Sequence, residues 1–246
     1  MIYSYKQESG EELLKDHIEE ILEILSASTD SKAFKFVEKL GILKTNFINS
    51  LKITAIFHDF GKIFYQNLWR KGGLSFAGHE RISAFILERF LDKLDELDMI
   101  DLEKLKSPML FAVLYHHHAM GRRWVPYGIR NISELKLLLE EFVKDASQLM
   151  EKYSLQPYLK PLKETILEFE RDLESNPNMV YELENLGLEN ALWESYVRGG
   201  VKRTLMLLSL SILTSLDYEA AKRRRGGEPP FYRAVKEFIK NYLEDK

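Results

Sequence analysis

Apolar residues along this chain recur mostly at intervals of three and four, which is the spacing of amphipathic helices. Alternating apolar and polar runs bounded by turn residues, which indicate strands, are almost missing. The pattern predicts an all-α protein. Its helices are expected over about residues 11–26, 31–40, 47–60, 78–91, 107–118, 133–153, 157–174, 188–223 (broken at Gly199-Gly200) and 229–243. Ser107-Pro108 should begin the fifth helix, and Gly61 should end the third.

The length of 246 residues fits one large domain, or a domain with a sizeable insertion. Residues 131–187 are charged and amphipathic and contain no histidine. We interpret them as a helical insertion, or an appended subdomain, within a single domain that spans residues 1–246. A plain scaffold role is the alternative interpretation of this segment.

Composition narrows the function classes. Lysine and arginine number 35 against 38 acidic residues, so the net charge is −3 and any anion-binding site must be local. The absence of cysteine excludes disulfides, thiolate metal sites and cysteine nucleophiles, so histidine and carboxylate must hold any metal. The N-terminus does not resemble a signal peptide, and the most apolar run, 201–216, is shorter than the roughly 20 residues that span a bilayer. We therefore expect a soluble, cytoplasmic protein with no membrane partner.

The six histidines can be sorted by the helix face on which each lies. His17 is four residues from both Leu13 and Ile21, on an apolar stripe, and His79 and His117 lie on apolar stripes as well. One inward histidine is more often a satisfied core residue than a metal ligand. Several together are costly, at about 1–3 kcal/mol for each unpaired buried group, and a shared metal is the simplest reason to gather them.

Two aspartates strengthen this hypothesis. Asp59 follows His58 at the end of an apolar helix, where a charge is expensive unless it meets a cation. Asp217 shares an apolar stripe with Leu213, although by itself it could be a surface acid. Neighbouring helical residues diverge by about 100°, so His58 and Asp59 both reach a metal only if the helix end faces the site. Imidazole and carboxylate suit Mn, Fe, Ni, Co or Zn better than calcium, and Mg is a further candidate.

In chain order, these residues resemble the HD phosphohydrolase superfamily. The matching residues are His17, His58-Asp59-Phe60-Gly61-Lys62, Gly78-His79-Glu80, the run His116-His117-His118, and Ser215-Leu216-Asp217. Within the superfamily, the chain is most similar to the HD nuclease of type I CRISPR interference systems, as a stand-alone subunit. The resemblance covers about residues 10–225, leaves 131–187 unmatched, and implies an HD-domain helical bundle with two divalent metal ions.

The resemblance also implies roles for individual residues. The first metal would be held by His17, His58, Asp59 and Asp217, and the second by Asp59, His79 and an adjacent histidine pair. This chain has three adjacent histidines, so the pair is either His116-His117 or His117-His118. The implied catalytic residues are His58, Asp59, Lys62 and Asp217. Lys62 would meet a phosphate oxygen, and its alternative interpretation is a solvated cation near a helix end.

Two such ions can activate water and clamp a phosphodiester, so we expect metal-dependent hydrolysis of single-stranded DNA, or of RNA. Arg122, Arg123 and Trp124 lie close to the histidine run and combine cations with a stacking ring. The segments 69–71 and 222–225 are basic too. By resemblance, the partners are a separate helicase subunit and an RNA-guided surveillance complex in antiviral defence.

Two other functions stay open at this point. An HD phosphohydrolase acting on a nucleotide or cyclic nucleotide would use the same metals in a closed pocket. A non-catalytic module would use the metals only to shape an interaction surface. Activity against oligonucleotides compared with nucleotides separates these hypotheses.

Overall fold

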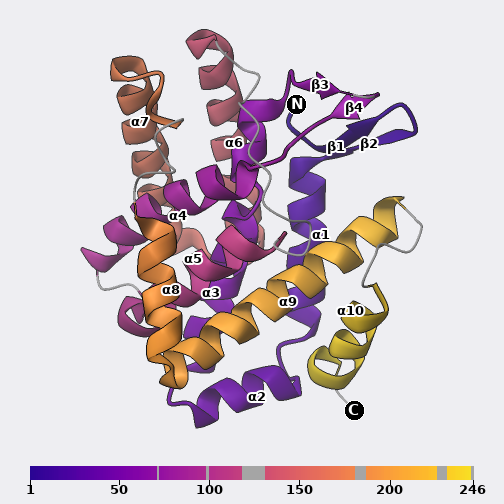
Figure 1. Cartoon of the computed structure of the whole chain (residues 1–246), viewed down its shortest axis with the longest axis vertical. Coiled ribbons are helices and arrows are strands. Elements are labelled where there is room, and N and C mark those ends of the chain that lie inside the picture. Colours follow the sequence, from indigo (N-terminus) through magenta and orange to yellow (C-terminus); the bar gives the residue numbers. More distant parts are fainter. Residues whose placement is uncertain (71, 98–99, 118–130, 181–186, 226–231, 245–246) are drawn as a thin grey trace.

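The computed structural model describes residues 1–70, 72–97, 100–117, 131–180, 187–225 and 232–244. This part of the chain is mostly helical, as the pattern predicts (Figure 1). The helices are α1 (Leu14–Ala27), α2 (Lys32–Lys39), α3 (Lys44–Phe57), α4 (His79–Asp95), α5 (Leu102–Tyr115), α6 (Ile132–Lys152), α7 (Leu159–Ser175), α8 (Leu188–Arg198), α9 (Gly200–Arg225) and α10 (Tyr232–Phe238). None of the helices in these ranges is long and apolar enough to cross a bilayer.

Helix α5 lies at the centre of the molecule. Its residues 109–114, Met-Leu-Phe-Ala-Val-Leu, are all buried, because a helix that is apolar on every side must be covered on every side. Helices α3, α4, α8 and α9 pack around it, and Figure 1 shows α9 crossing the bundle diagonally. The break predicted between α8 and α9 is confirmed, and Gly199 and Gly200 both adopt positive φ there, at 76° and 71°.

Helices α6 and α7 lie side by side in the segment 131–187 and share the core of the other helices. The ring of Phe142 in α6 lies 4.8 Å from that of Phe60, and the ring of Phe169 in α7 lies 6.3 Å from it. Phe60 belongs to a short 3₁₀ helix, η1 (Phe60–Tyr65), that directly follows the His58-Asp59 pair. The segment therefore supports the backbone next to this pair, and its status as an insertion stays a prediction.

A small antiparallel sheet is the feature that helical periodicity does not predict. Its strands β1 (Tyr3–Gln7), β2 (Gly10–Leu13), β3 (Trp69–Arg70) and β4 (Gly73–Leu74) pair in the order β2-β1-β4-β3. Residues 11–13 thus belong to a strand, and not to the helix expected to start at residue 11. Figure 1 places the sheet at the N-terminal end of α1. Strands of two to five residues are too short to show a clear alternation.

Two of the differences between expected and observed helix boundaries affect the site or its supporting helix. Helix α5 begins at Leu102, capped by the Asp101 carboxylate, which accepts a hydrogen bond from the Lys104 backbone N–H at 3.4 Å. Pro108 therefore lies inside the helix and Ser107 is not a cap. Helix α3 ends at Phe57, so His58 and Asp59 occupy a turn between two helices. His58 keeps helical dihedrals, and its N–H still donates to Thr54 O at 2.9 Å. Asp59 leaves the helical conformation, with φ of −109° and ψ of 7°, which allows both side chains to point to one place.

Candidate metal centre

The histidines of the candidate site lie mostly at helix ends. His58 follows α3, His79 begins α4, His116 and His117 follow α5, and His17 lies in the second turn of α1. Asp217 comes from α9, at the other end of the sequence. With the exception of His117, which is half-buried, all of these side chains are buried together with Asp59. Segments about 200 residues apart are thereby joined, since His17 contacts Asp217.

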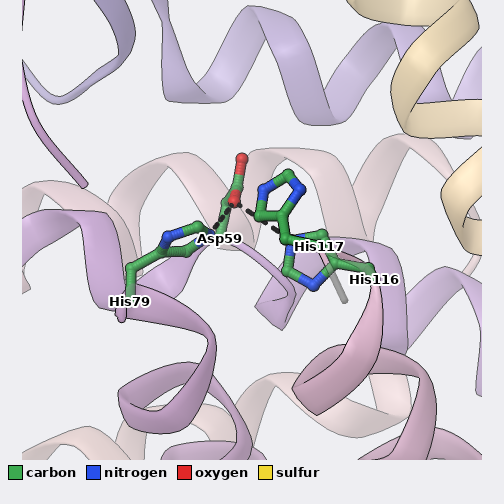
Figure 2. Close-up of side chains that lie close together, drawn as sticks. All are labelled: Asp59, His79, His116 and His117. Carbon is green, nitrogen blue, oxygen red and sulfur yellow. Dashed lines mark ion pairs between the residues drawn. The ribbon is translucent and has the colours of Figure 1, made fainter. Parts of the chain in front are cut away.

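The Asp59 carboxylate is the centre of the cluster. Its Oδ1 lies 2.7 Å from Nε2 of His79 and 3.7 Å from Nε2 of His116. Its Oδ2 lies 3.3 Å from Nε2 of His58 and 3.7 Å from Nε2 of His17. Figure 2 shows the carboxylate between His79 and the pair formed by His116 and His117. The two oxygens of one aspartate thus face two different sets of imidazoles.

These contacts form two overlapping groups that could hold metal ions. Asp59, His79, His116 and His117 each offer a ligand atom, and these atoms lie within 4.8 Å of one another. His17, His58 and Asp59 meet the same condition. Asp217 is outside both groups and joins the site through His17, with 2.9 Å between Asp217 Oδ1 and His17 Nε2.

Backbone carbonyls fix the orientation of three imidazoles. A carbonyl oxygen can only accept, so each Nδ1 that contacts one must carry the proton. The three pairs are His58 Nδ1 with Ala55 O at 2.7 Å, His79 Nδ1 with Phe76 O at 2.6 Å, and His116 Nδ1 with Val113 O at 2.7 Å. In the neutral ring, each Nε2 then presents a lone pair to the cluster. Imidazoles that bind metals are commonly held in this way by an acceptor behind the ring.

The atoms that face the centre lack ordinary hydrogen-bond partners. Within the described residues, Nε2 of His58, His79 and His116 and Oδ1 of Asp59 complete no hydrogen bond. The 2.7 Å between His79 Nε2 and Asp59 Oδ1 is short enough for one, but the two groups are not aligned as donor and acceptor. Buried polar atoms without partners cost about 1–3 kcal/mol each. A cation shared by these atoms would remove that cost.

Charge in the cluster is arranged to keep both aspartates ionised. Burial favours the neutral form of Asp59, but His58 and Lys62 outweigh it and hold the pKa of this carboxyl well below its usual range. Burial likewise opposes ionisation of Asp217, yet the hydrogen bond from His17 lowers the pKa of that carboxyl. Burial also acts against His17, but contacts with Asp217 and Glu12 raise its pKa to about 9. A proton on His17 therefore balances Asp217 at neutral pH.

Burial lowers the pKa of two of the imidazoles. Burial, as the largest cause, lowers the pKa of His58, and it lowers the pKa of His117 well below the ordinary histidine value. His116 also contributes to the shift at His117 through repulsion between neighbouring imidazoles. A metal ion needs the neutral form of the ring, and a lowered pKa favours that form.

Lys62 lies inside the cluster. Only 6% of the residue is exposed, and its Nζ is 2.5 Å from Asp59 Oδ2. The interpretation of Lys62 as a solvated cation is therefore wrong. The 3₁₀ helix η1 places residue 62 one turn after residue 59, which brings the ammonium group back onto the carboxylate. Its contact with a phosphate oxygen stays a prediction.

The histidine run differs from its helical interpretation. Helix α5 ends at Tyr115, so helical phase does not apply to the residues that follow, and it does not single out His117. His116 is the more buried of the two, and the rings of His116 and His117 lie 3.9 Å apart in the cluster. His118 lies outside the described residues.

The predicted nucleic-acid contacts are only partly described. Arg122, Arg123, Trp124 and Lys71 lie outside the described residues. Trp69 and Arg70 are exposed on β3. Two basic residues of the segment 222–225 make contacts within the protein. Arg223 forms ion pairs with Glu20 at 2.9 Å and Glu219 at 3.1 Å, and Lys222 lies 3.6 Å from the centre of the Tyr232 ring.

Gly61 and Ser83 position the site by joining η1 to α4. The sequence alone does not predict this role. The Gly61 backbone N–H donates to Ser83 Oγ at 2.8 Å, which ties η1 to α4. A Cβ at Gly61 would lie 2.1 Å from the backbone oxygen of His79. Glycine is required here for this close approach, and not as the helix stop that the sequence suggests.

Glu12 is the other residue that sequence reasoning misses. It is buried on β2, its Oε1 lies 3.5 Å from His17 Nδ1, and its Oε2 accepts a hydrogen bond from Ser4 Oγ at 2.8 Å. Glu11-Glu12 reads in sequence as the exposed first turn of a helix, so no signal in the pattern points to it.

Comparisons with known proteins add no family to this picture. Neither a scan against protein-family models nor searches of curated proteins and of solved structures gave a match. The fold and the site define a mostly helical protein with a buried cluster of histidine and aspartate that could hold metal ions.

Proposed function

We propose that this chain is a metal-dependent phosphodiesterase of the HD kind, which hydrolyses single-stranded DNA or RNA in CRISPR-based antiviral defence. The observation that carries the proposal is the position of Asp59. Its two oxygens face two separate sets of imidazoles, the arrangement required of a carboxylate that bridges two ions. The link to type I CRISPR systems rests on the order of the motifs in the sequence.

The residues present fit a pair of divalent ions. One ion would be held by His79, His116 and His117. The other would be held by His17, His58 and Asp217, and Asp59 would contact both ions. Two such ions would lower the pKa of bound water and would stabilise the charge on the phosphodiester oxygens. The chain contains no cysteine, and this chemistry needs no nucleophilic side chain. Lys62 would add a fixed positive charge where a phosphate oxygen arrives.

A polymer substrate is supported by the distribution of charge. The net charge of −3 does not suit attraction over the whole surface, so strand binding must use local groups. Arg122, Arg123 and Trp124 begin four residues after His118 and provide cations and an aromatic ring. Trp69, half of which is exposed on β3, offers a second ring. Such mixtures bind single strands through phosphate pairing and base stacking.

The test combines elemental analysis with an activity screen. Purified protein would be assayed with Mg²⁺, Mn²⁺, Fe²⁺, Co²⁺, Ni²⁺ and Zn²⁺ against single-stranded DNA, single-stranded RNA, duplex DNA, nucleotides and cyclic nucleotides. We expect up to two ions per chain and cleavage of single strands. Asp59→Asn should remove the activity. Asp30→Asn, which alters an exposed aspartate paired with Lys44, should not, and this pair of variants excludes a contaminating nuclease.

The other outcomes assign the alternatives. Hydrolysis of nucleotides or cyclic nucleotides alone would make the chain a small-molecule phosphohydrolase. Protein that binds metal but hydrolyses none of these substrates would be a non-catalytic module. Either result would overturn the proposed nuclease activity.

A further inference from the structure

The imidazoles of the metal centre differ in what lies behind them. Nδ1 of His58, His79 and His116 each meets the carbonyl three residues earlier. The carbonyls of Ala55 and Val113 are available because they lie in the last turn of a helix, where carbonyls lack partners within the helix. Phe76 precedes α4, and its carbonyl also accepts from the His79 backbone N–H at 3.1 Å. His17 lies within α1, and the Leu14 carbonyl three residues before it belongs to the hydrogen-bond ladder of that helix. His17 therefore needs an acceptor from elsewhere.

Glu12 occupies that place. We propose that Glu12 is a positioning residue that holds His17 with Nδ1 protonated and Nε2 directed at the metal centre, so that the N-terminal sheet is part of the site. The carboxylate Oε1 lies 3.5 Å from His17 Nδ1, on the side of the ring opposite Nε2, which contacts Asp217 and Asp59. Neither Oε1 nor Nδ1 completes a hydrogen bond within the described residues, so this contact is an ion pair that a small shift would turn into a hydrogen bond. This inference rests on the proposed function for its metal, and on the contacts alone for its geometry.

Burial supports a specific role for this carboxylate. Glu12 is 6% exposed, whereas its neighbour Glu11 on the same strand is exposed and pairs with Lys6 at 3.3 Å. Burying a carboxylate costs several kcal/mol unless hydrogen bonds and opposite charge compensate for it. Ser4 Oγ supplies a hydrogen bond at 2.8 Å, and His17 supplies the nearby positive charge.

The sheet holds Glu12 rigidly relative to the cluster. Strand β2 carries Glu12 and pairs with β1, and β1 is fixed to η1 by the Gln66 side chain. Gln66 Oε1 accepts from the Tyr3 backbone N–H at 2.8 Å, and Gln66 Nε2 donates to Tyr3 O at 3.1 Å. The same Nε2 donates to the carbonyl of Lys62 at 2.9 Å. The segment that carries Lys62 and the strand that carries Glu12 are therefore joined.

Charge balance explains why a carboxylate suits this position. His17 Nε2 would have to release the proton that it shares with Asp217 in order to hold a metal ion, and Nδ1 would keep its own proton. A hydrogen bond from Nδ1–H to a carboxylate would make the ring a stronger donor to the metal than a hydrogen bond to a neutral acceptor would. Loss of such an outer partner commonly lowers metal affinity by about 10- to 100-fold.

The experiment measures metal binding and the His17 tautomer separately. Zn²⁺ affinity and stoichiometry would be measured by calorimetry in the wild type, Glu12→Ala, Glu12→Gln and the matched control Glu11→Ala. Long-range ¹H–¹⁵N NMR spectra would report which nitrogen of His17 carries the proton, with and without Zn²⁺. We expect Glu12→Ala to weaken the binding of one ion by about 10- to 100-fold and to shift the His17 Nδ1 signal of the Zn²⁺-bound protein. Glu11→Ala should match the wild type.

The conservative variant keeps the test decisive even if Glu12→Ala folds poorly. Glu12→Gln still offers an amide oxygen to Nδ1–H but no charge, so it should keep the tautomer and lose less affinity than the alanine variant. Unchanged affinity and unchanged His17 signals in Glu12→Gln and Glu12→Ala would overturn the inference. If Glu12 controls Zn²⁺ binding but the wild type cleaves no nucleic acid, the inference holds and the proposed nuclease function fails.

Discussion

Replacing Gly61 by alanine tests how the backbone builds the metal centre. The added Cβ would lie 2.1 Å from His79 O, and carbon contacts under 3.0 Å are essentially never seen, so η1 and α4 must separate by the difference. Overpacking together with loss of the bond from the Gly61 N–H to Ser83 Oγ should lower the free energy of unfolding by roughly 2–4 kcal/mol. His79 would move away from Asp59, and we expect about a tenfold or greater loss in affinity for one metal ion.

Chemical unfolding and calorimetric titration with Zn²⁺ or Mn²⁺ measure the two effects. Gly41→Ala is the matched control, because Gly41 has φ of 75° but no atom within 4 Å of an added Cβ. It should lose about 1–2 kcal/mol through backbone strain and bind metal normally. If Gly61→Ala proves as stable as the wild type and binds the same ions equally well, the close approach of η1 to α4 does not shape the site.

Three further variants probe the cluster and its surroundings. Asp59→Asn should abolish metal binding, as measured by elemental analysis. It should also destabilise the fold by roughly 3–5 kcal/mol, because Lys62 is left buried without its counter-charge. A stable variant that retains two ions would contradict this prediction. Lys62→Met should raise Zn²⁺ affinity in calorimetry, since the ammonium no longer competes for Asp59 Oδ2, while oligonucleotide cleavage falls; weaker Zn²⁺ binding would show that Lys62 supports the site. Joint replacement of Arg122 and Arg123 by alanine should make oligonucleotide binding less sensitive to salt. The slope of log binding constant against log salt concentration should fall by up to about 0.7 for each phosphate that is no longer neutralised, with metal content unchanged. An unaltered slope would exclude both residues from strand binding.

The helices of the fold could be predicted from the sequence because their apolar stripes are long. Helix α5 and the break at Gly199-Gly200 follow from apolar runs and glycine positions alone. The N-terminal sheet could not be predicted, because its strands are held by pairing between residues about 65 apart, such as Gln7 with Gly73. Local periodicity carries no information about such a contact.

The histidines could be identified from the sequence, but their geometry could not. Helical phase treats His58 and Asp59 as divergent and singles out His117, yet both arguments assume a helix that continues through these residues. In the structure Asp59 leaves the helical conformation directly after His58, and α5 ends at Tyr115, so adjacent side chains turn to the same centre. The end of a helix depends on tertiary packing, and one residue of error at that end changes the direction of a ligand by about 100°.

The position of a histidine relative to a helix end also determines whether the local backbone can orient its imidazole ring. A histidine just beyond a helix can donate Nδ1–H to a carbonyl of the last turn, as His58 and His116 do, so the local sequence supplies both the ligand and its orienting acceptor. A histidine within a helix has no such carbonyl and must recruit a distant side chain. His17 is in this position, which is why its partner Glu12 lies on a strand that the periodicity does not reveal. A metal ligand expected in a helix interior should therefore prompt a search for a buried carboxylate outside that helix.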